Sequence, residues 1–377
     1  MTDVLERHPV GRLPDEWERA AEALGERPFR GRQVFKWIHA RGTTDPELMT
    51  DLPRDLRARL GEGPRTLPLD VTEVHRSNDG TRKLVCALEK GGKVECVLIP
   101  MSDSPDDDPD DPDTDWDGRV TLCISTQIGC AMGCTFCASG QAGLERGLDA
   151  AEVVAQVLVA RRYLDPGERL RNLVFMGMGE PLHHYDETAR TIRLLTHPEG
   201  LGMSPRRITV STVGLAPGIR RLGEDFEGKV GLALSLHAPN DAVRGRIMPM
   251  NRRYPIAEVL DALRKYPLPK RRRITIEYTL LAGVNDELSH ARELAKVLRG
   301  IRVKVNLIPM NPVIGAAFQP PTESRVQAFR ELLANEGLSA FVRKQRGDDV
   351  DAACGQLVLK ERLARRRTEA ACSDESS

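Results

Sequence analysis

The chain has 377 residues, 40% of them hydrophobic, which is enough for one large domain with a sizeable core and a smaller domain beside it. Its 55 basic and 55 acidic residues cancel, but nine of the acids are aspartates between Asp103 and Asp117, a stretch without a basic residue. Without those nine, 46 acids remain against 55 bases, and this excess of positive charge indicates a polyanionic partner.

The sequence offers no signal for a membrane or for secretion. No run of about 18 apolar residues is present, as a spanning helix would need. Residues 1–14 include Asp3 and Glu6 and lack an apolar stretch, so they do not predict a secretory signal. Eight cysteines, three of them clustered, favour a metal site over a disulfide framework in a chain of this length. We therefore expect a cytoplasmic protein.

The first region, residues 1–65, is predicted to be helical, with an amphipathic segment at Phe29–Ala40 and another helix beginning near Asp51. Basic and aromatic side chains alternate along part of it: Arg27, Phe29, Arg30, Arg32, Phe35, Lys36 and Trp37. RNA-binding surfaces combine positive charge with rings that stack on bases. We expect this region to contact RNA, with an ordinary solvated face as the alternative.

Residues 66–118 are predicted to form a β extension. Thr81–Leu88 and Val94–Ile99 alternate as strands do, and Asp79-Gly80 is a turn signal. Residues 101–118 are rich in aspartate and proline and cannot bury apolar surface. We expect them to be a disordered insertion, more simply an inert loop than a mimic of nucleic-acid charge.

From Arg119 onward, strand-like and helix-like segments alternate, which predicts parallel strands joined by helices. The six strand candidates are Arg119–Thr126, Asn172–Met176, Arg207–Thr212, Val230–Leu236, Arg273–Leu281 and Val303–Ile308. Helices are predicted at Ala151–Tyr163, with Asp149 as its N-cap, and at Glu287–Leu298.

The predicted fold class is therefore α/β: a partial (βα)6 TIM-type barrel over residues 119–345, with a small N-terminal α+β accessory domain. Ser339–Lys344 is expected to add a closing strand. Residues 346–361 would form a C-terminal loop, and residues 362–377 a disordered tail.

Three cysteines follow the first barrel strand at the spacing Cys130-x-x-x-Cys134-x-x-Cys137. Barrel enzymes place their chemistry in the loops at the carboxyl ends of their strands. Three thiolates can hold a 4Fe-4S cluster and leave one iron open to a ligand. A structural zinc site is the alternative, but zinc closes with four ligands, and no fourth Cys or His lies at finger-like spacing.

Small and polar residues also follow the other predicted strands. Gly179 and Glu180 come after the second strand, where glycine lets backbone approach a ligand and a carboxylate can accept a hydrogen bond from an amino group. The later strands are followed by residues suited to ribose and carboxylate contacts: Ser211, Ser235, Leu236, His237 and Asn311. Each of these residues alone would more often be structural.

The cysteine spacing, with Phe136 before the last cysteine, resembles the signature of the radical S-adenosylmethionine superfamily, and the segment ending in Glu180 resembles its motif for the methionyl amine. Further residues narrow the resemblance: Glu95, Cys123, the Leu-Ser-Leu-His segment ending at His237, the Ile-Pro-Met-Asn-Pro segment ending at Pro312, and Cys354. Together they are similar to the RNA adenine C2-methyltransferases of the RlmN type. The similarity extends from Phe29 to Cys354, and the C8-methylating Cfr group shares the cluster and both distal cysteines.

The resemblance implies a set of cofactors and residue roles. One 4Fe-4S cluster would be held by Cys130, Cys134 and Cys137, and two molecules of S-adenosylmethionine would be used per turnover. One molecule methylates Cys354; the second yields a 5′-deoxyadenosyl radical that activates this methyl group for addition to C2 of adenine. Glu95 would remove the C2 proton, and Cys123 would release the product by forming a disulfide with Cys354. Addition of a radical suits this carbon, since C2 lies between two ring nitrogens and is too electron-poor to attack a methyl cation equivalent.

The implied substrates are an adenosine of the peptidyl-transferase centre in 23S rRNA and the adenosine 3′ of certain anticodons in tRNA. A flavodoxin-type electron donor and a monomeric state would be usual. Three alternatives stay open: the C8-methylating activity, an RNA-binding protein with a structural metal site, and a radical enzyme acting on a small molecule or a protein. The acidic insertion departs from the family pattern, and we expect activity to survive deletion of Asp103–Asp115.

Overall fold

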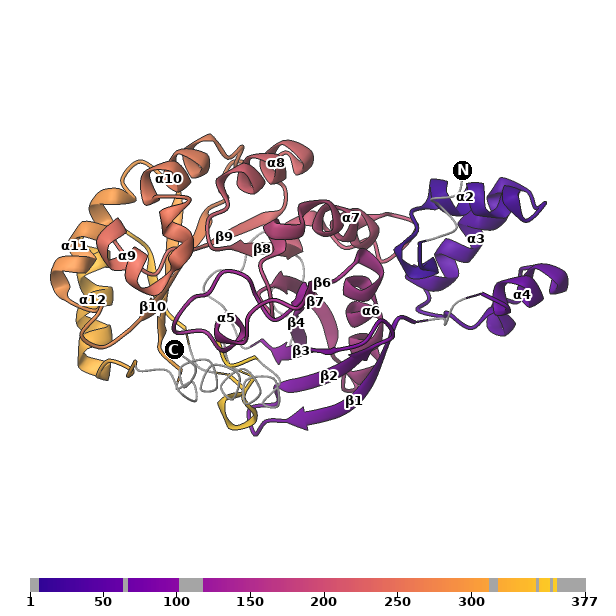
Figure 1. Ribbon diagram of the computed structural model, residues 1–377, viewed down its shortest axis with the longest axis horizontal. Helices are drawn as coiled ribbons and strands as arrows, with labels where there is room; N and C mark the ends of the chain where they lie inside the picture. Colours follow the sequence, from indigo (N-terminus) through magenta and orange to yellow (C-terminus); the bar gives the residue numbers. More distant parts are fainter. Residues whose placement is uncertain are drawn as a thin grey trace, which may run out of the picture.

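The computed structural model describes residues 7–63, 67–101, 118–311, 318–343, 346–352 and 355–357. One ten-stranded sheet organises these residues, in the order β1-β2-β3-β4-β7-β8-β9-β10-β11-β12. The first four strands pair antiparallel, and every pair from β4 to β12 is parallel. Figure 1 shows the sheet curving through the centre of the molecule, with the N-terminal helices at one end and α8 to α12 around the other. The predicted α/β class is confirmed.

The strands of this sheet are β1 (Leu69–Arg76), β2 (Arg82–Leu88), β3 (Lys93–Pro100), β4 (Arg119–Cys123), β7 (Arg169–Phe175), β8 (Ile208–Thr212), β9 (Gly231–Ser235), β10 (Ile274–Leu280), β11 (Val303–Pro309) and β12 (Ala340–Val342). A separate two-stranded ladder pairs β5 (Gln127–Ile128) with β6 (Arg146–Gly147). The helices of the barrel part are α5 (Ala138–Ala142), α6 (Ala150–Ala160), α7 (Tyr185–Thr196), α8 (Ala216–Phe226), α9 (Asp241–Ile247), α10 (Ile256–Lys265), α11 (Leu288–Val297) and α12 (Glu323–Asn335).

All six predicted barrel strands are present, and β12 adds the expected closing strand beside β11. The first strand ends at Cys123 rather than at the predicted Thr126. The chain leaves the ladder there because the Ser125 backbone exchanges hydrogen bonds with the Gln156 side chain, and the Thr126 N–H turns to the carbonyl of Met178. The residues before the cysteine cluster therefore form a loop held against the second barrel strand.

Helix α6 occupies the middle of the core, between the strands β1 to β3 and the segments around α7 and Pro9–Gly11. All eleven of its residues are buried: nine are alanine, valine or leucine, and the two polar ones, Glu152 and Gln156, are hydrogen-bonded. Asp149 caps it as predicted, accepting from the Glu152 N–H while the Glu152 carboxylate accepts from the N–H of Asp149. This helix fixes the accessory strands to the barrel.

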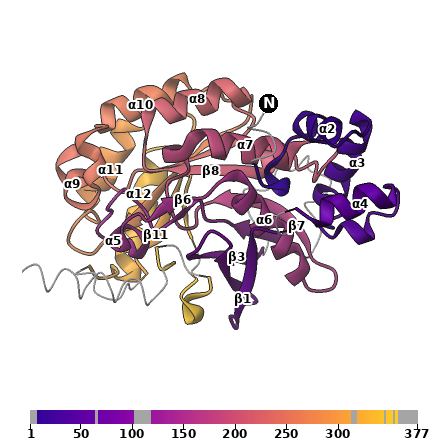
Figure 2. The same cartoon turned by 45° about the vertical axis from the view of Figure 1, so that its right-hand side comes forward.

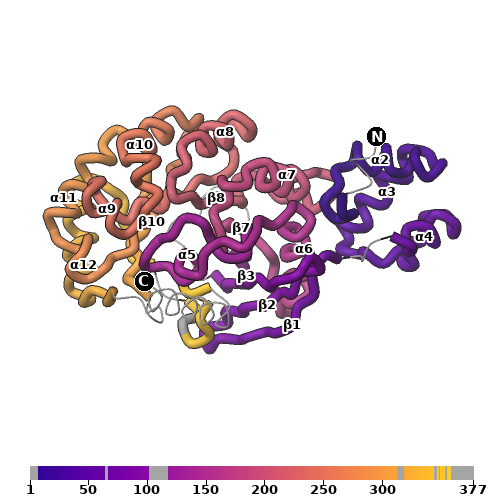
Figure 3. Tube along the Cα trace, viewed as in Figure 1, coloured from indigo at the N-terminus to yellow at the C-terminus, as the bar shows by residue number. Residues whose placement is uncertain are grey.

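The N-terminal region is helical, as predicted, and consists of α2 (Pro14–Ala23), α3 (Pro28–His39) and α4 (Arg54–Gly61) with two short 3-10 turns. These helices stay together at one end of the molecule in the turned view and in the tube trace (Figures 2 and 3). Within the described part of the chain, no helix combines the length and apolar character needed to cross a membrane.

Candidate active site

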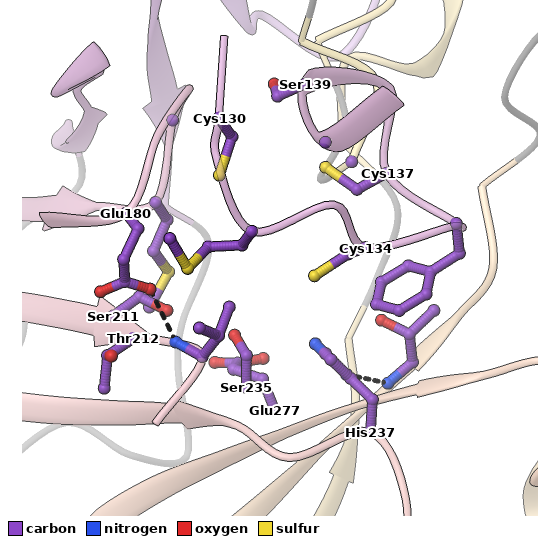
Figure 4. Close-up of a pocket in the computed structure, with 18 of the residues that line it drawn as sticks. Cys130, Cys134, Cys137, Ser139, Glu180, Ser211, Thr212, Ser235, His237 and Glu277 are labelled. Carbon is purple, nitrogen blue, oxygen red and sulfur yellow. Dashed lines mark hydrogen bonds between the residues drawn. The ribbon is translucent and has the colours of Figure 1, made fainter. Parts of the chain in front are cut away.

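The cysteine loop lies over the carboxyl ends of the parallel strands, as the sequence predicted. Cys130, Cys134 and Cys137 all line one pocket there, with an empty volume of about 990 Å³ that is open to solvent. Their sulfur atoms are directed into a common space, with Glu180 on the facing wall (Figure 4). The loop is fixed from outside, because Thr135 donates its N–H to the carbonyl of Ile247 and Cys130 donates to that of Gly143.

Glu180 is buried at the end of the segment after β7 and is 2% exposed. Its Oε2 accepts from the N–H of Val213 at 2.8 Å and its Oε1 from that of Leu182 at 3.0 Å. Burial raises the pKa of Glu180 to about 7, although these donors and the Thr212 hydroxyl oppose the shift. Each carboxylate oxygen can accept a second hydrogen bond, so the group remains able to receive an amino group of a ligand.

Two glycines let this segment approach the loop after β4. A Cβ on Gly177 would lie 2.7 Å from the carbonyl oxygen of Ile124. Gly179 has φ +107°, and a Cβ there would lie 2.6 Å from Cγ of Gln127. Gln127 in turn accepts the N–H of Glu180 at 2.9 Å. The glycines therefore set the depth of Glu180 in the pocket by close backbone packing rather than by turn geometry alone.

The other predicted strand-end residues converge on the same space. Ser211, Ser235, His237 and Asn311 line the pocket, whereas Leu236 is fully buried and does not. Nδ1 of His237 accepts the N–H of Thr279 at 2.9 Å, which leaves the ring proton on Nε2. Burial, together with Arg244, lowers the pKa of His237 to about 3, so the ring is a neutral donor at physiological pH.

Glu277 is a pocket residue that the sequence did not single out. It lies in the middle of β10, is 5% exposed, and lines the pocket near Arg343. Its Oε1 accepts from the Asn306 side chain at 3.2 Å, and its Oε2 has no hydrogen-bond partner among the described residues. Burial raises the pKa of Glu277, with Arg343, Asn306 and Lys304 acting in the opposite direction. The free oxygen is available to a donor from a bound ligand.

Glu95 and Cys123 are not among the residues that line the pocket. Both share one face of the sheet: Val97 pairs directly with Cys123 of β4, and Glu95 is two residues before Val97 on β3. Glu95 is 3% exposed, its Oε1 is 3.2 Å from Nζ of Lys83, and no residue in the described part of the chain makes a hydrogen bond to its Oε2. Burial raises the pKa of Glu95, and the charge of Lys83 opposes this shift.

Cys354 lies outside the described residues, but the chain on either side of it is anchored. Before it, the carbonyl of Asp351 accepts a hydrogen bond from the Lys83 ammonium at 3.3 Å. After it, the carbonyl of Gly355 accepts from the N–H of Ala138 at 2.9 Å, and that of Leu357 accepts from the Ser139 hydroxyl at 2.5 Å. The cysteine loop and the accessory strands therefore hold the two ends of the segment that contains Cys354.

The donor set of this pocket fits an iron-sulfur cluster better than a zinc ion. Among the described residues, no group of three or more His, Cys, Asp or Glu side chains is placed to hold a single metal ion. Three thiols around a wider space suit a multi-iron centre that leaves one position open. Burial raises the pKa of Cys130 to about 12, so a positively charged centre is needed to hold it as a thiolate.

The proposed RNA surface on α3 needs one correction. Phe35 is fully buried and stacks on His39, because it belongs to the helical core and cannot stack on a base. Phe29 is 46% exposed under the Arg30 guanidinium, and Arg41 lies 3.8 Å from the Trp37 ring. The basic and aromatic side chains that could contact RNA on this helix therefore lie at positions other than Phe35.

Parallel strands with a three-cysteine loop and a buried glutamate over their carboxyl ends define a radical S-adenosylmethionine enzyme. Residues 124–295 match the family model of the radical SAM superfamily, and residues 15–63 match that of the ribosomal RNA large subunit methyltransferase N-terminal domain.

Among curated proteins, the dual-specificity RNA methyltransferase RlmN of Sorangium cellulosum is 56% identical, over 93% of this chain and 95% of its own length. The RlmN of Syntrophobacter fumaroxidans is 46% identical, over 92% and 96%. A solved radical SAM methyltransferase from Sphaerobacter thermophilus is 44% identical, with a TM-score of 0.83 over 92% of this chain and 98% of that one.

The chain belongs to the RlmN family of the radical SAM superfamily. Its cofactors are those of the superfamily, a 4Fe-4S cluster and S-adenosylmethionine. The resemblance stated from the sequence is thereby confirmed.

Proposed function

We propose that this protein methylates C2 of a specific adenosine in the peptidyl-transferase centre of 23S rRNA and of the adenosine 3′ of certain tRNA anticodons. The relatives that support this carry the name dual-specificity RNA methyltransferase. The structural observation that carries it is the shared sheet face of Glu95 and Cys123, with no hydrogen-bond partner for Oε2 of Glu95 among the residues that the structure describes. A base and a resolving thiol are the two groups that an S-methylcysteine route requires near its substrate.

In this proposal Cys130, Cys134 and Cys137 hold the cluster, and the ligand contacts come from Gly179, Glu180, Ser211, Ser235, His237 and Asn311, which line the pocket, whereas Leu236 does not. When bound, the cluster and two molecules of S-adenosylmethionine per turnover supply the methyl group and the 5′-deoxyadenosyl radical. Cys354 carries the methyl carbon to C2 of the adenine as an effectively intramolecular reagent. Glu95 takes the C2 proton on Oε2 while the adduct radical loses one electron, which the cluster would accept. Cys123 then attacks the sulfur of Cys354, so that a disulfide forms, the bond from this sulfur to the methylene carbon breaks, and that carbon takes up a proton to become the methyl group.

The same proposal includes the partners of the protein and the functions of its successive regions. Residues 1–65 would contact RNA, 66–118 would form the β extension, 119–345 the barrel, 346–361 the catalytic-cysteine loop and 362–377 a tail. The match of residues 15–63 to a ribosomal RNA methyltransferase N-terminal domain supports the first of these boundaries. The protein would act as a cytoplasmic monomer with a flavodoxin-type electron donor.

Anaerobic turnover tests this function. Reconstituted protein is incubated with S-adenosylmethionine, dithionite and a 23S rRNA or tRNA transcript, and the nucleosides are compared with 2-methyl- and 8-methyladenosine standards by mass spectrometry. We expect 2-methyladenosine that disappears in Cys354→Ala. An 8-methyladenosine product would assign the chain to the C8-methylating activity, and the absence of any methyladenosine with an intact cluster would overturn the assignment.

A further inference from the structure

The accessory strands place one lysine against two parts of the proposed site. Lys83 lies on β2 directly opposite Val97 of β3, on the sheet face that also carries Glu95 and Cys123. Its ammonium is 3.2 Å from Oε1 of Glu95. The same nitrogen donates to the carbonyl of Asp351 at 3.3 Å, three residues before Cys354. One buried cation therefore contacts both the proposed base and the segment that leads to the proposed methyl carrier.

We propose that Lys83 is a positioning residue for the proton-transfer step: it keeps Glu95 ionised with Oε2 uncommitted, and it fixes Asp351 relative to that carboxylate. This inference rests on the proposed function, since it takes Glu95 as the base. Nothing in the sequence motifs of the family resemblance marks Lys83, and Lys83 is not among the described residues that line the pocket.

Burial makes the charge of Lys83 necessary. The side chains of Lys83 and Glu95 are only 8% and 4% exposed, so water stabilises neither charge well. Removing one partner of a buried ion pair leaves the other without compensation, and a buried carboxylate then takes up a proton. A protonated Glu95 cannot accept the C2 proton, so the loss of Lys83 would remove the base without altering Glu95 itself.

The contact to Asp351 links this ion pair to the C-terminal segment. Asp351 has φ +50°, a left-handed conformation that non-glycine residues rarely adopt. The segment keeps this shape with the Lys83 bond to the Asp351 carbonyl and a bond from the Ala352 N–H to the carbonyl of Gly347 at 2.8 Å. Lys83 therefore holds both the Glu95 carboxylate and the stretch of chain that leads to Cys354.

The other charged groups around Glu95 have smaller effects on its pKa than Lys83 has. Asp351 of the C-terminal segment raises the pKa of Glu95, and His75 of β1 lowers it, both with smaller effects. Two buried thiols are also near: Cys96 follows Glu95 on β3, and Cys123 lies on the neighbouring strand β4. Lys83 is thus the group whose removal most changes the ionisation of Glu95.

The test measures the pH dependence of turnover with the full-length holoenzyme. Lys83→Met and Lys83→Gln remove the charge, Lys83→Arg keeps it, and Glu95→Gln removes the base. Lys265→Met is the matched control, because the Lys265 side chain on α10 is 68% exposed and forms an ion pair with Asp261, one turn earlier on the same helix. Cluster iron and thermal unfolding are measured for each variant, and rates are divided by the S-methyl content of Cys354 from peptide mass spectrometry.

In the Met and Gln variants we expect kcat to fall roughly tenfold or more at neutral pH, with little change in KM for RNA. The ascending limb of their pH–rate profile should move to higher pH, since the charge that lowers the pKa of Glu95 is gone. Lys83→Arg should restore most of the rate, and Lys83→Met combined with Glu95→Gln should be no slower than Glu95→Gln alone.

Three results would overturn the proposal: an unchanged pH limb in both neutral variants, equal losses in the neutral and arginine variants, or additive losses in the double variant. A Glu95→Gln enzyme with the full rate would remove its premise, the role of Glu95. Failure of the proposed function is distinguishable from all of these, because the enzyme without substitutions would then yield no 2-methyladenosine at any pH.

Discussion

Close backbone packing at single glycines decides how the buried glutamate of the pocket is presented. Gly179 precedes Glu180 and combines two constraints, a φ of +107° and direct contact with the Gln127 and Thr126 side chains. Gly167 has only the first constraint, because its φ is +88° and no atom lies within 4 Å of the position of a Cβ. The two glycines therefore separate the cost of backbone strain from the cost of steric overlap.

We expect Gly167→Ala to lower the free energy of unfolding by about 1 kcal/mol, the usual cost of a left-handed alanine. Gly179→Ala should cost roughly 1 to 3 kcal/mol more, because the Gln127 side chain must move as well. It should also weaken binding of S-adenosylmethionine, since Glu180 would shift with its neighbour. Urea unfolding and equilibrium binding check both statements. Equal destabilisation by the two substitutions would show that the contact with Gln127 does not matter.

At the scale of elements, the turn between β1 and β2 holds the segment at 346–352 against the sheet. The Gly347 N–H donates to the Asp79 carboxylate at 3.1 Å, and the Ser77 hydroxyl and Asn78 N–H donate to that of Asp349. A Cβ on Gly347 would lie 2.9 Å from Cγ2 of Thr81, so the two segments are in direct contact. The β extension is thus a support for the C-terminal segment.

Asp79→Ala should release this segment. Burial alone would raise the pKa of Asp79, but hydrogen bonds from Thr81, Ser77 and the Gly347 N–H lower it to about 2. A depressed pKa means that the stabilisation is present above the ordinary value near 3.8 and is lost as the pH falls toward 2. We expect faster amide hydrogen exchange at Gly347–Ala352 in the variant at pH 7. Unchanged exchange there would argue against the support.

The capping box of α6 makes a second prediction at this scale. Asp149 caps the helix and also binds Lys90 of the β2–β3 turn at 2.6 Å. Asp149→Ala should lower the free energy of unfolding by about 1 to 2 kcal/mol, the cost of a lost N-cap. Asp55→Ala is the control, because Asp55 lies in the first turn of α4, whose N-cap makes no side-chain bond. Denaturant unfolding of both variants checks the difference.

At the scale of the whole molecule, the acidic insertion leaves and re-enters the sheet at one place. Its residues 102–117 lie outside the described part, but Met101 donates its N–H to the carbonyl of Arg119 at 2.8 Å. Pro100 pairs with Val120 in the antiparallel ladder of β3 and β4. A short turn can therefore join the two strands without moving Glu95 or Cys123.

We accordingly expect the variant lacking Asp103–Asp115 to fold, to bind its cluster and to methylate RNA. Shortening the loop should stabilise the fold slightly, by about 1 kcal/mol or less from loop-closure entropy. Thermal unfolding, iron content and nucleoside mass spectrometry check these points. Loss of methylation with folding and cluster content preserved would assign the insertion a role in catalysis or RNA binding.

The sequence predicted the parts of the site that depend on chain order and missed those that depend on strand register. Strand ends of a parallel sheet meet at one edge, so Glu180, Ser211 and His237 could be expected near the cysteines. Lys83 and Glu277 lie inside strands, where a charged residue is usually solvent-facing, and only the pairing of β2 with β3 and of β10 with β11 brings them to the site. Register of this kind cannot be read from one strand alone.

The anchoring of the C-terminal segment on α5 has a consequence for how the enzyme matures. Ala138 and Ser139, which bind the carbonyls of Gly355 and Leu357, directly follow Cys137 in the chain. The cysteine loop leaves the ribosome more than 200 residues before the segment that contains Cys354. The residues that anchor Gly355 and Leu357 are therefore synthesised first. Because they directly follow Cys137, we expect a failure to load the cluster to loosen the segment around residues 355–357 as well.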